Sequence, residues 1–262
     1  MKNFLGVIRY EYKMSTQRPG LWIVVLLFSA FYVYLAIEGA NYVDVDAYSI
    51  SRSALFAQAG QRVFSLNLFF PVIAGIAAAD RAVRDRSLGV RELIRVTGVT
   101  DLRYALGKYL GVTLSLLTFG MAITLSTGII QTIYYHWPLV FVVDTFWATL
   151  VLMGPALVLV TAFSLVCPLF MPIRLYQILF TGYWYWGNYL SSNVMFTVSD
   201  TLLNASGRYA LIGVFDMKMA ETWAEISVSQ VWMNILVLFA CAALALIGML
   251  WVLRVSEKGA GR

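Results

Sequence analysis

Residues 80–108, DRAVRDRSLGVRELIRVTGVTDLRYALGK, hold eleven charged residues in a chain that is otherwise mostly apolar. Uncharged runs flank them on both sides, at residues 63–79 and 109–135. A segment this rich in Arg and Lys between two membrane spans faces the cytoplasm, so it orients the whole chain. Its alternation of apolar and charged residues also predicts a surface for a partner rather than a plain tether.

The composition predicts a membrane protein. Of the 262 residues, 60% are hydrophobic and 13% are charged, which excludes a soluble globular domain. A membrane-spanning helix needs about 20 apolar residues, and the gaps between charges provide six such runs. We therefore predict an all-α integral membrane fold, one transmembrane domain over residues 1–262, with six spans near residues 19–37, 63–79, 109–135, 145–167, 174–193 and 229–253.

The distribution of Lys and Arg sets the expected orientation. Basic residues precede the first span, fill residues 80–108, separate spans four and five, and follow span six. Few fall on the other side, so both termini are expected in the cytoplasm and residues 194–228 form an external segment. The net charge of +5 follows from this bias, and we expect no nucleic-acid partner. The basic residues of the external set are Arg52, Arg62, Arg208 and Lys218.

Residues 1–17 predict a basic amphipathic helix in the headgroup layer of the membrane. Phe4, Ile8 and Tyr12 recur every four residues, with Arg9 and Lys13 on the polar face. Such a helix makes membrane lipid a partner of the chain. Farther on, residues 107–111 carry a Gly-xxx-Gly pattern, which favours close approach of another helix.

The sequence lacks the motifs of the common enzyme classes. Gly107 and Lys108 are followed by Tyr109 and have no glycine five residues before them, so they are not a phosphate-binding P-loop. There is no HExxH or GxSxG stretch, and the two cysteines fall inside expected spans. We therefore expect no catalytic, cofactor or metal site in this chain. If the protein transports a substrate, the energy comes from a partner.

Three short stretches within the charged segment resemble a known family. GVRELI (89–94), TGVT (97–100) and LGK (106–108) are similar to the "GTxELL…TPVS…GK" stretch of the permease subunit of type-2 ATP-binding-cassette (ABC) exporters. The chain differs from that pattern at Val90, Gly98 and Asp101. The order of spans around the segment is also that of the family.

The resemblance implies a cytoplasmic coupling helix, around residues 91–96, that sits in a cleft of a separate ATPase subunit. Apolar and charged side chains alternate there between two glycines, which are natural helix breakers. It further implies two ATPase subunits, which hold ATP and Mg²⁺, a second permease that is identical or related, and a bacterial plasma membrane. The expected coupling residues are Gly89, Arg91, Glu92, Leu93, Ile94, Arg95, Val96 and Gly98.

A substrate path is expected where spans two and five meet, with Asn67, Tyr183 and Asn188 as its candidate residues. The aromatic cluster of span five suits an amphipathic substrate, or alternatively an aromatic belt at the membrane surface. Two other functions stay open. The first alternative is a scaffold or sensor that anchors an ATPase without transporting a substrate, and the second is an enzyme that modifies lipid.

Overall fold

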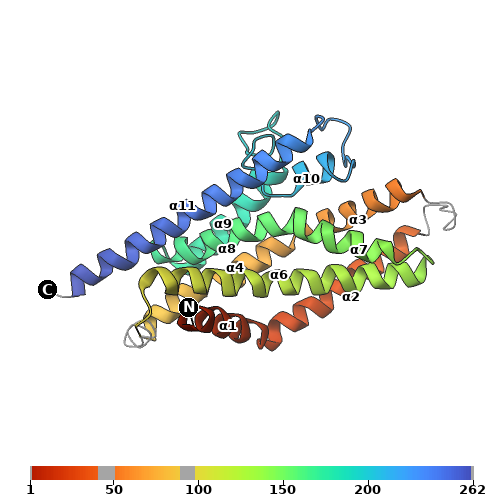
Figure 1. The fold of residues 1–262 in the computed structure, drawn as a ribbon. Helices are drawn as coiled ribbons and strands as arrows, with labels where there is room; N and C mark the ends of the chain where they lie inside the picture. Colours follow the sequence, from red (N-terminus) through yellow and green to blue (C-terminus); the bar gives the residue numbers. More distant parts are fainter. Residues whose placement is uncertain (1, 41–50, 89–97, 261–262) are drawn as a thin grey trace.

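The computed structural model describes residues 2–40, 51–88 and 98–260, and all regular secondary structure in these ranges is helical. Side chains are described there except at residues 2, 3, 36, 38–40, 82, 86, 87 and 253–260. Figure 1 shows long helices that run roughly alongside one another. The elements are α1 (Lys2–Thr16), α2 (Pro19–Ala40), α3 (Arg52–Asn67), α4 (Phe70–Ser87), α6 (Asp101–Tyr134), α7 (Val140–Ala148), η1 (Thr149–Met153), α8 (Gly154–Val166), η2 (Cys167–Leu169), α9 (Ile173–Tyr189), α10 (Arg208–Gly213) and α11 (Val228–Ala260).

Three helical stretches are long and apolar enough to cross a membrane: Asp101–Tyr134, Val140–Leu169 and Val228–Val252. Two bent pairs bring the number to as many as five if each pair is one span. They are Phe4–Thr16 with Pro19–Leu35, bent by 61°, and Arg52–Asn67 with Phe70–Asp85, bent by 44°. The all-helical character is thus confirmed among the described residues, and three to five helical stretches could span a membrane, while six spans stay a prediction.

The helix boundaries differ from those expected. The run at residues 63–79 belongs to two helices, because α3 begins at Arg52 and α4 continues to Ser87. Likewise α6 begins at Asp101 rather than 109. The expected span at 174–193 corresponds to α9, whose 17 residues are fewer than the roughly 20 that cross a bilayer. Charged residues that were taken as span boundaries therefore lie inside helices.

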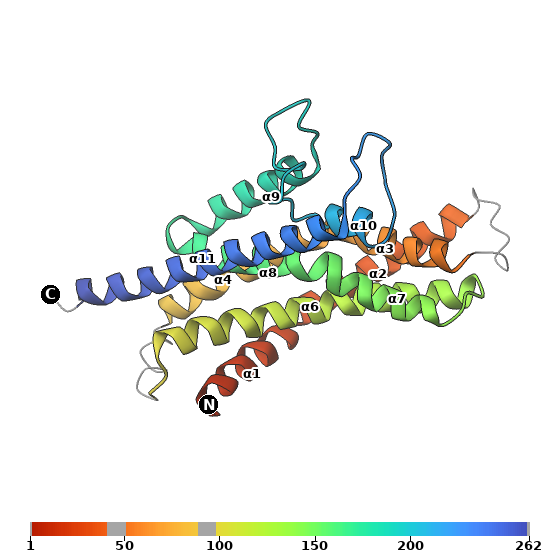
Figure 2. The same ribbon diagram turned by 45° about the horizontal axis from the view of Figure 1, so that its top comes forward.

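One end of the bundle gathers α1, the adjoining ends of α4 and α6, and the C-terminal end of α11 (Figure 1). The opposite end holds the start of α3 and the turn between α6 and α7. When the molecule is turned, α9 and the segment between it and α11 stand out from the other helices (Figure 2). In agreement, α9 packs mainly against α4 and η2.

The Gly-xxx-Gly pattern marks a close helix contact, as expected, and its partner is α1. A Cβ atom at Gly107 would lie 2.8 Å from Val7 Cγ1. At Gly111 it would lie 2.6 Å from Glu11 Cβ and 2.8 Å from the carbonyl oxygen of Ile8. Because glycine has no side chain there, the two backbones can approach each other. The amphipathic N-terminal segment is helical, and one of its faces is buried against α6.

Candidate functional site

Most of the expected coupling residues, Gly89 and 91–96, lie outside the described residues. The described flanks show how the segment is held. Gly98 is exposed and has a φ of 76°, a left-handed conformation that favours glycine. Val99 beside it is buried in a core formed with Tyr104, and α6 then begins at Asp101. The Thr100 hydroxyl caps this helix by accepting a hydrogen bond from the Arg103 backbone N–H.

A buried ionic cluster lies at the base of this segment. The Lys108 ammonium group is fully buried, 2.8 Å from Glu11 Oε1 and 2.6 Å from Asp85 Oδ2. The Tyr104 hydroxyl donates to the same Asp85 oxygen at 2.6 Å. These four side chains come from α1, α4 and α6, so one lysine joins three helices.

Arg81 brings a second cation to the cluster. It lies one helical turn before Asp85 on α4, is 3% exposed, and donates to the Ser15 hydroxyl of α1. Its charge also interacts favourably with those of Glu11, Asp80 and Asp85 and unfavourably with that of Arg18. Charges of both signs therefore meet here, which matters because an unpaired charge away from water is strongly unfavourable.

The cluster ties together both ends of the 88–100 connection and the N-terminal helix. Asp85 lies two residues before the end of α4, and Tyr104 lies in the first turn of α6. Neither end can shift without moving the other or breaking a buried charge pair. Sequence reasoning missed this site, because Glu11 and Lys108 are far apart in the chain and Lys108 was placed in the cytoplasmic segment. The only sequence pattern that pointed to this region was the Gly-xxx-Gly pattern at Gly107 and Gly111, which predicted a close contact with another helix.

Two of the three candidate path residues meet at a single segment of the chain, residues 204–206. The Asn67 Nδ2 group donates to the carbonyl oxygen of Ser206 at 2.7 Å, and Asn188 Oδ1 accepts from the Ala205 backbone N–H at 2.7 Å. Both asparagines are buried. They hold residues 204–206 against the bundle, and Asn67 lines none of the described cavities.

The third, Tyr183, faces a different space. It lines an apolar cavity of about 420 Å³ between α8, α9 and α11, together with Phe180, Trp184 and Cys241. The structure of one chain therefore does not bring Tyr183 and the two asparagines into one path. The buried Trp184 and the exposed Tyr183 also divide the aromatic cluster of α9 between an inner and an outer face.

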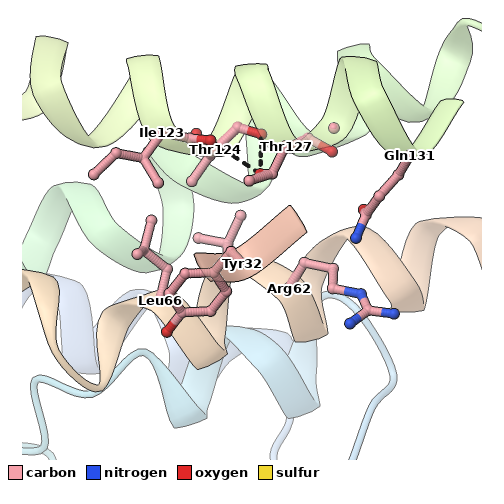
Figure 3. A pocket seen from close by; sticks show the side chains of 10 residues that line it. Tyr32, Arg62, Leu66, Ile123, Thr124, Thr127 and Gln131 are labelled. Carbon is pink, nitrogen blue, oxygen red and sulfur yellow. Dashed lines mark hydrogen bonds between the residues drawn. The ribbon is translucent and has the colours of Figure 1, made fainter. Parts of the chain in front are cut away.

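Figure 3 shows a small pocket between α2, α3, α6 and α7, with Arg62 and Gln131 at the same end of it. Arg62 Nε is buried without a hydrogen-bond partner. The Thr124 and Thr127 hydroxyls donate to carbonyl groups of their own helix, and Thr124 also accepts from the Thr149 hydroxyl. The cavity measures about 10 Å³, which has room for about one water molecule. It suits a water that solvates Arg62 and is too small for a transported substrate.

Among the residues with described side chains, no three His, Cys, Asp or Glu residues lie close enough together to hold a metal ion. Comparisons of the chain with known protein families, with curated proteins and with solved structures give no match. The features that point to a function are therefore the ionic cluster, the charged sequence of residues 80–108 and the helices that could span a membrane.

Proposed function

We propose that this chain is the membrane-spanning subunit of an ATP-driven exporter of the type-2 ABC class. It forms the substrate path, and a separate ATPase subunit drives it through residues 89–98. The observation that supports this proposal best is the ionic cluster of Glu11, Arg81, Asp85 and Lys108, which lies where that segment joins the bundle.

In this proposal, motion of the ATPase must be transmitted through the coupling segment to the helices of the bundle. A short helix that docks in a partner transmits motion only if its base is stiff. Here Asp85 of α4 accepts hydrogen bonds from both Tyr104 and Lys108 of α6, so the two helices that flank the segment are held together. Lys108 also holds Glu11 of α1. A displacement of the segment would therefore tilt α1, α4 and α6 as one body, which is a rigid-body type of switching.

The expected assembly contains two ATPase subunits, which hold ATP and Mg²⁺, and a second permease that is identical or related. The chain contributes no catalytic group of its own in this proposal. Both termini and the coupling segment face the cytoplasm of a bacterial cell. In support, α1, the adjoining ends of α4 and α6, and the C-terminal end of α11 lie at one end of the bundle (Figure 1).

The test is purification of the chain from its native host membrane. A stoichiometric ATPase should copurify with the unaltered protein and be lost on triple charge reversal, Arg91→Glu, Glu92→Lys and Arg95→Glu. The matched control is Lys218→Glu with Glu225→Lys, which reverses an ion pair on the far segment and should leave the ATPase bound. If no ATPase copurifies with the unaltered chain, the proposal is wrong.

A second measurement separates the exporter from the scaffold alternative. Membrane vesicles that contain the recovered complex should take up an amphipathic dye in the presence of ATP, and the dye should stimulate ATP hydrolysis. A bound ATPase whose hydrolysis is unaffected by any of a panel of amphipathic compounds would favour a scaffold or sensor instead.

A further inference from the structure

A polar cavity of about 310 Å³ lies between the end of α9 and the loop that precedes α11. Its walls come from Phe64 of α3, the C-terminal end of α9, the segment that follows, the first residue of α10 and the loop before α11. The volume lies within the roughly 300–1,000 Å³ typical of pockets for small ligands. Unlike the apolar cavity beside Tyr183, this one is lined largely by hydroxyl, amide and charged groups.

The charged groups of the cavity neutralise each other. Arg208 Nη1 lies 2.6 Å from Asp200 Oδ1, and the arginine side chain is 11% exposed. The guanidinium carbon lies 4.6 Å from the ring centre of Trp223, which fixes the arginine from the other side. The Ser192 hydroxyl and Arg208 hold the pKa of Asp200 below its usual range. The pair is therefore ionised at neutral pH, and the cavity offers no net charge to a ligand.

Hydrogen-bonding capacity remains on both members of the pair. Arg208 lines the cavity, and its buried Nε, a hydrogen-bond donor, has no partner in the structure. The Asp200 carboxylate is exposed and has about four lone-pair positions. It accepts bonds from Arg208, Ser192 and Ser199. The exposed hydroxyls of Ser191 and Thr222 can each donate or accept at the rim.

A ligand that satisfies these groups must accept from the arginine N–H, donate to the carboxylate and carry no net charge. Hydroxyl groups on adjacent carbon atoms meet all three conditions, because each hydroxyl both donates and accepts. The cavity also has an apolar wall of Phe64, Tyr189 and Trp223, which suits the C–H face of a ring. We propose that this cavity binds a small uncharged polyhydroxyl ligand with the chemistry of a monosaccharide. This inference does not depend on the exporter proposal.

The test uses the full chain in phospholipid nanodiscs, prepared in a detergent without a sugar headgroup, since a glycoside detergent would compete. Saturation-transfer difference NMR would be recorded with glucose, with the anion gluconate and with the cation glucosamine. Glucose should give a saturable signal, and the two charged analogues should bind at least about tenfold more weakly, as a lost hydrogen bond to a charged group predicts. A glucosyl lipid in the nanodisc that displaces free glucose would identify a headgroup as the source of the ligand, and failure to displace would identify the free sugar.

Two variants locate the binding. Thr222→Trp fills the cavity from its rim and should abolish the glucose signal. Met219→Trp adds the same side chain at an exposed position of the same loop outside the cavity, and should leave binding unchanged. Ser192→Ala, which removes a partner of Asp200 without adding bulk, should weaken binding. The proposal is wrong if glucose does not bind, if gluconate or glucosamine binds as tightly, or if both tryptophan variants behave alike.

Discussion

Replacing Lys108 with methionine removes the buried cation that joins α1, α4 and α6. Methionine has a similar length, so the packing changes little while the positive charge is lost. The carboxylates of Glu11 and Asp85 then face each other, with Tyr104 able to donate to one of them. Breaking a buried ion pair by removing one partner costs about 3–5 kcal/mol. Because Arg81 stays nearby as a second cation, we expect a loss of about 3 kcal/mol, at the lower end of this range.

The measurement is the free energy of unfolding of the chain in mixed micelles, titrated with sodium dodecyl sulfate and followed by tryptophan fluorescence. Lys108→Met should be strongly destabilised. Adding Glu11→Gln to it should recover part of the loss, because one of the two unpaired charges is then removed. The coupling between the two substitutions should be about 1–3 kcal/mol, as for residues in one ionic network. The matched control is Lys13→Met, which makes the same substitution on the exposed side of α1.

Two results would refute this reasoning. The first is a Lys108→Met variant as stable as Lys13→Met, which would mean that the lysine is solvated. The second is strict additivity of the Glu11 and Lys108 substitutions, which would mean that the two side chains do not interact. In the proposed assembly, Lys108→Met should also retain the bound ATPase while losing substrate-stimulated hydrolysis, because the docking surface is intact and its base is loosened.

Three further predictions use the same unfolding assay. Gly111→Leu should cost about 1–3 kcal/mol, because the new side chain meets the backbone of α1, whereas Gly248→Leu has open space and should be nearly neutral. Arg52→Met should destabilise more than Asp144→Asn, since the first leaves a buried carboxylate unpaired and the second leaves an arginine whose side chain is 55% exposed; equal effects would contradict this. The lowered pKa of Asp200 means that folding stabilises its ionised form. Its contribution to the free energy of unfolding is therefore complete above the unfolded pKa of about 4, and it is lost as the pH falls through the lower folded pKa. Because Asp200 is 42% exposed, the loss should be below about 1 kcal/mol, and Asp200→Asn should abolish this pH dependence below pH 4.

The all-helical membrane character could be predicted from the sequence because long uncharged runs have few other physical solutions. The close contact at Gly107 and Gly111 could also be predicted, since small residues four apart mark one helix face. The helix boundaries could not. Each charge was taken as the end of a span, which assumes that charged side chains are in water. Lys108 lies inside α6 because Glu11 and Asp85 neutralise it.

The candidate path residues illustrate a different limit. Asn67 and Asn188 were chosen as polar groups at membrane depth, and the structure places both at buried positions. Their partners are backbone groups of residues 204–206, which no local pattern connects to them. A buried asparagine that bonds to the backbone and one that faces a substrate have the same sequence signature. The two can be told apart only by the tertiary contacts.

The ionic cluster and the polar cavity are linked through α4. Asp85 and Arg81 place one end of α4 in the cluster, and the body of the same helix is the main neighbour of α9. The contact is tight, because a Cβ atom at Gly75 would overlap the ring of Phe180. In the last turn of α9, Asn188 supports residues 204–206. Close-packed contacts transmit displacement, whereas the cavity beside Tyr183 leaves α9 loosely held on its other side. A tilt of α4 driven from the charged segment would therefore be passed to α9 as well as to α8, and through α9 to the wall of the polar cavity.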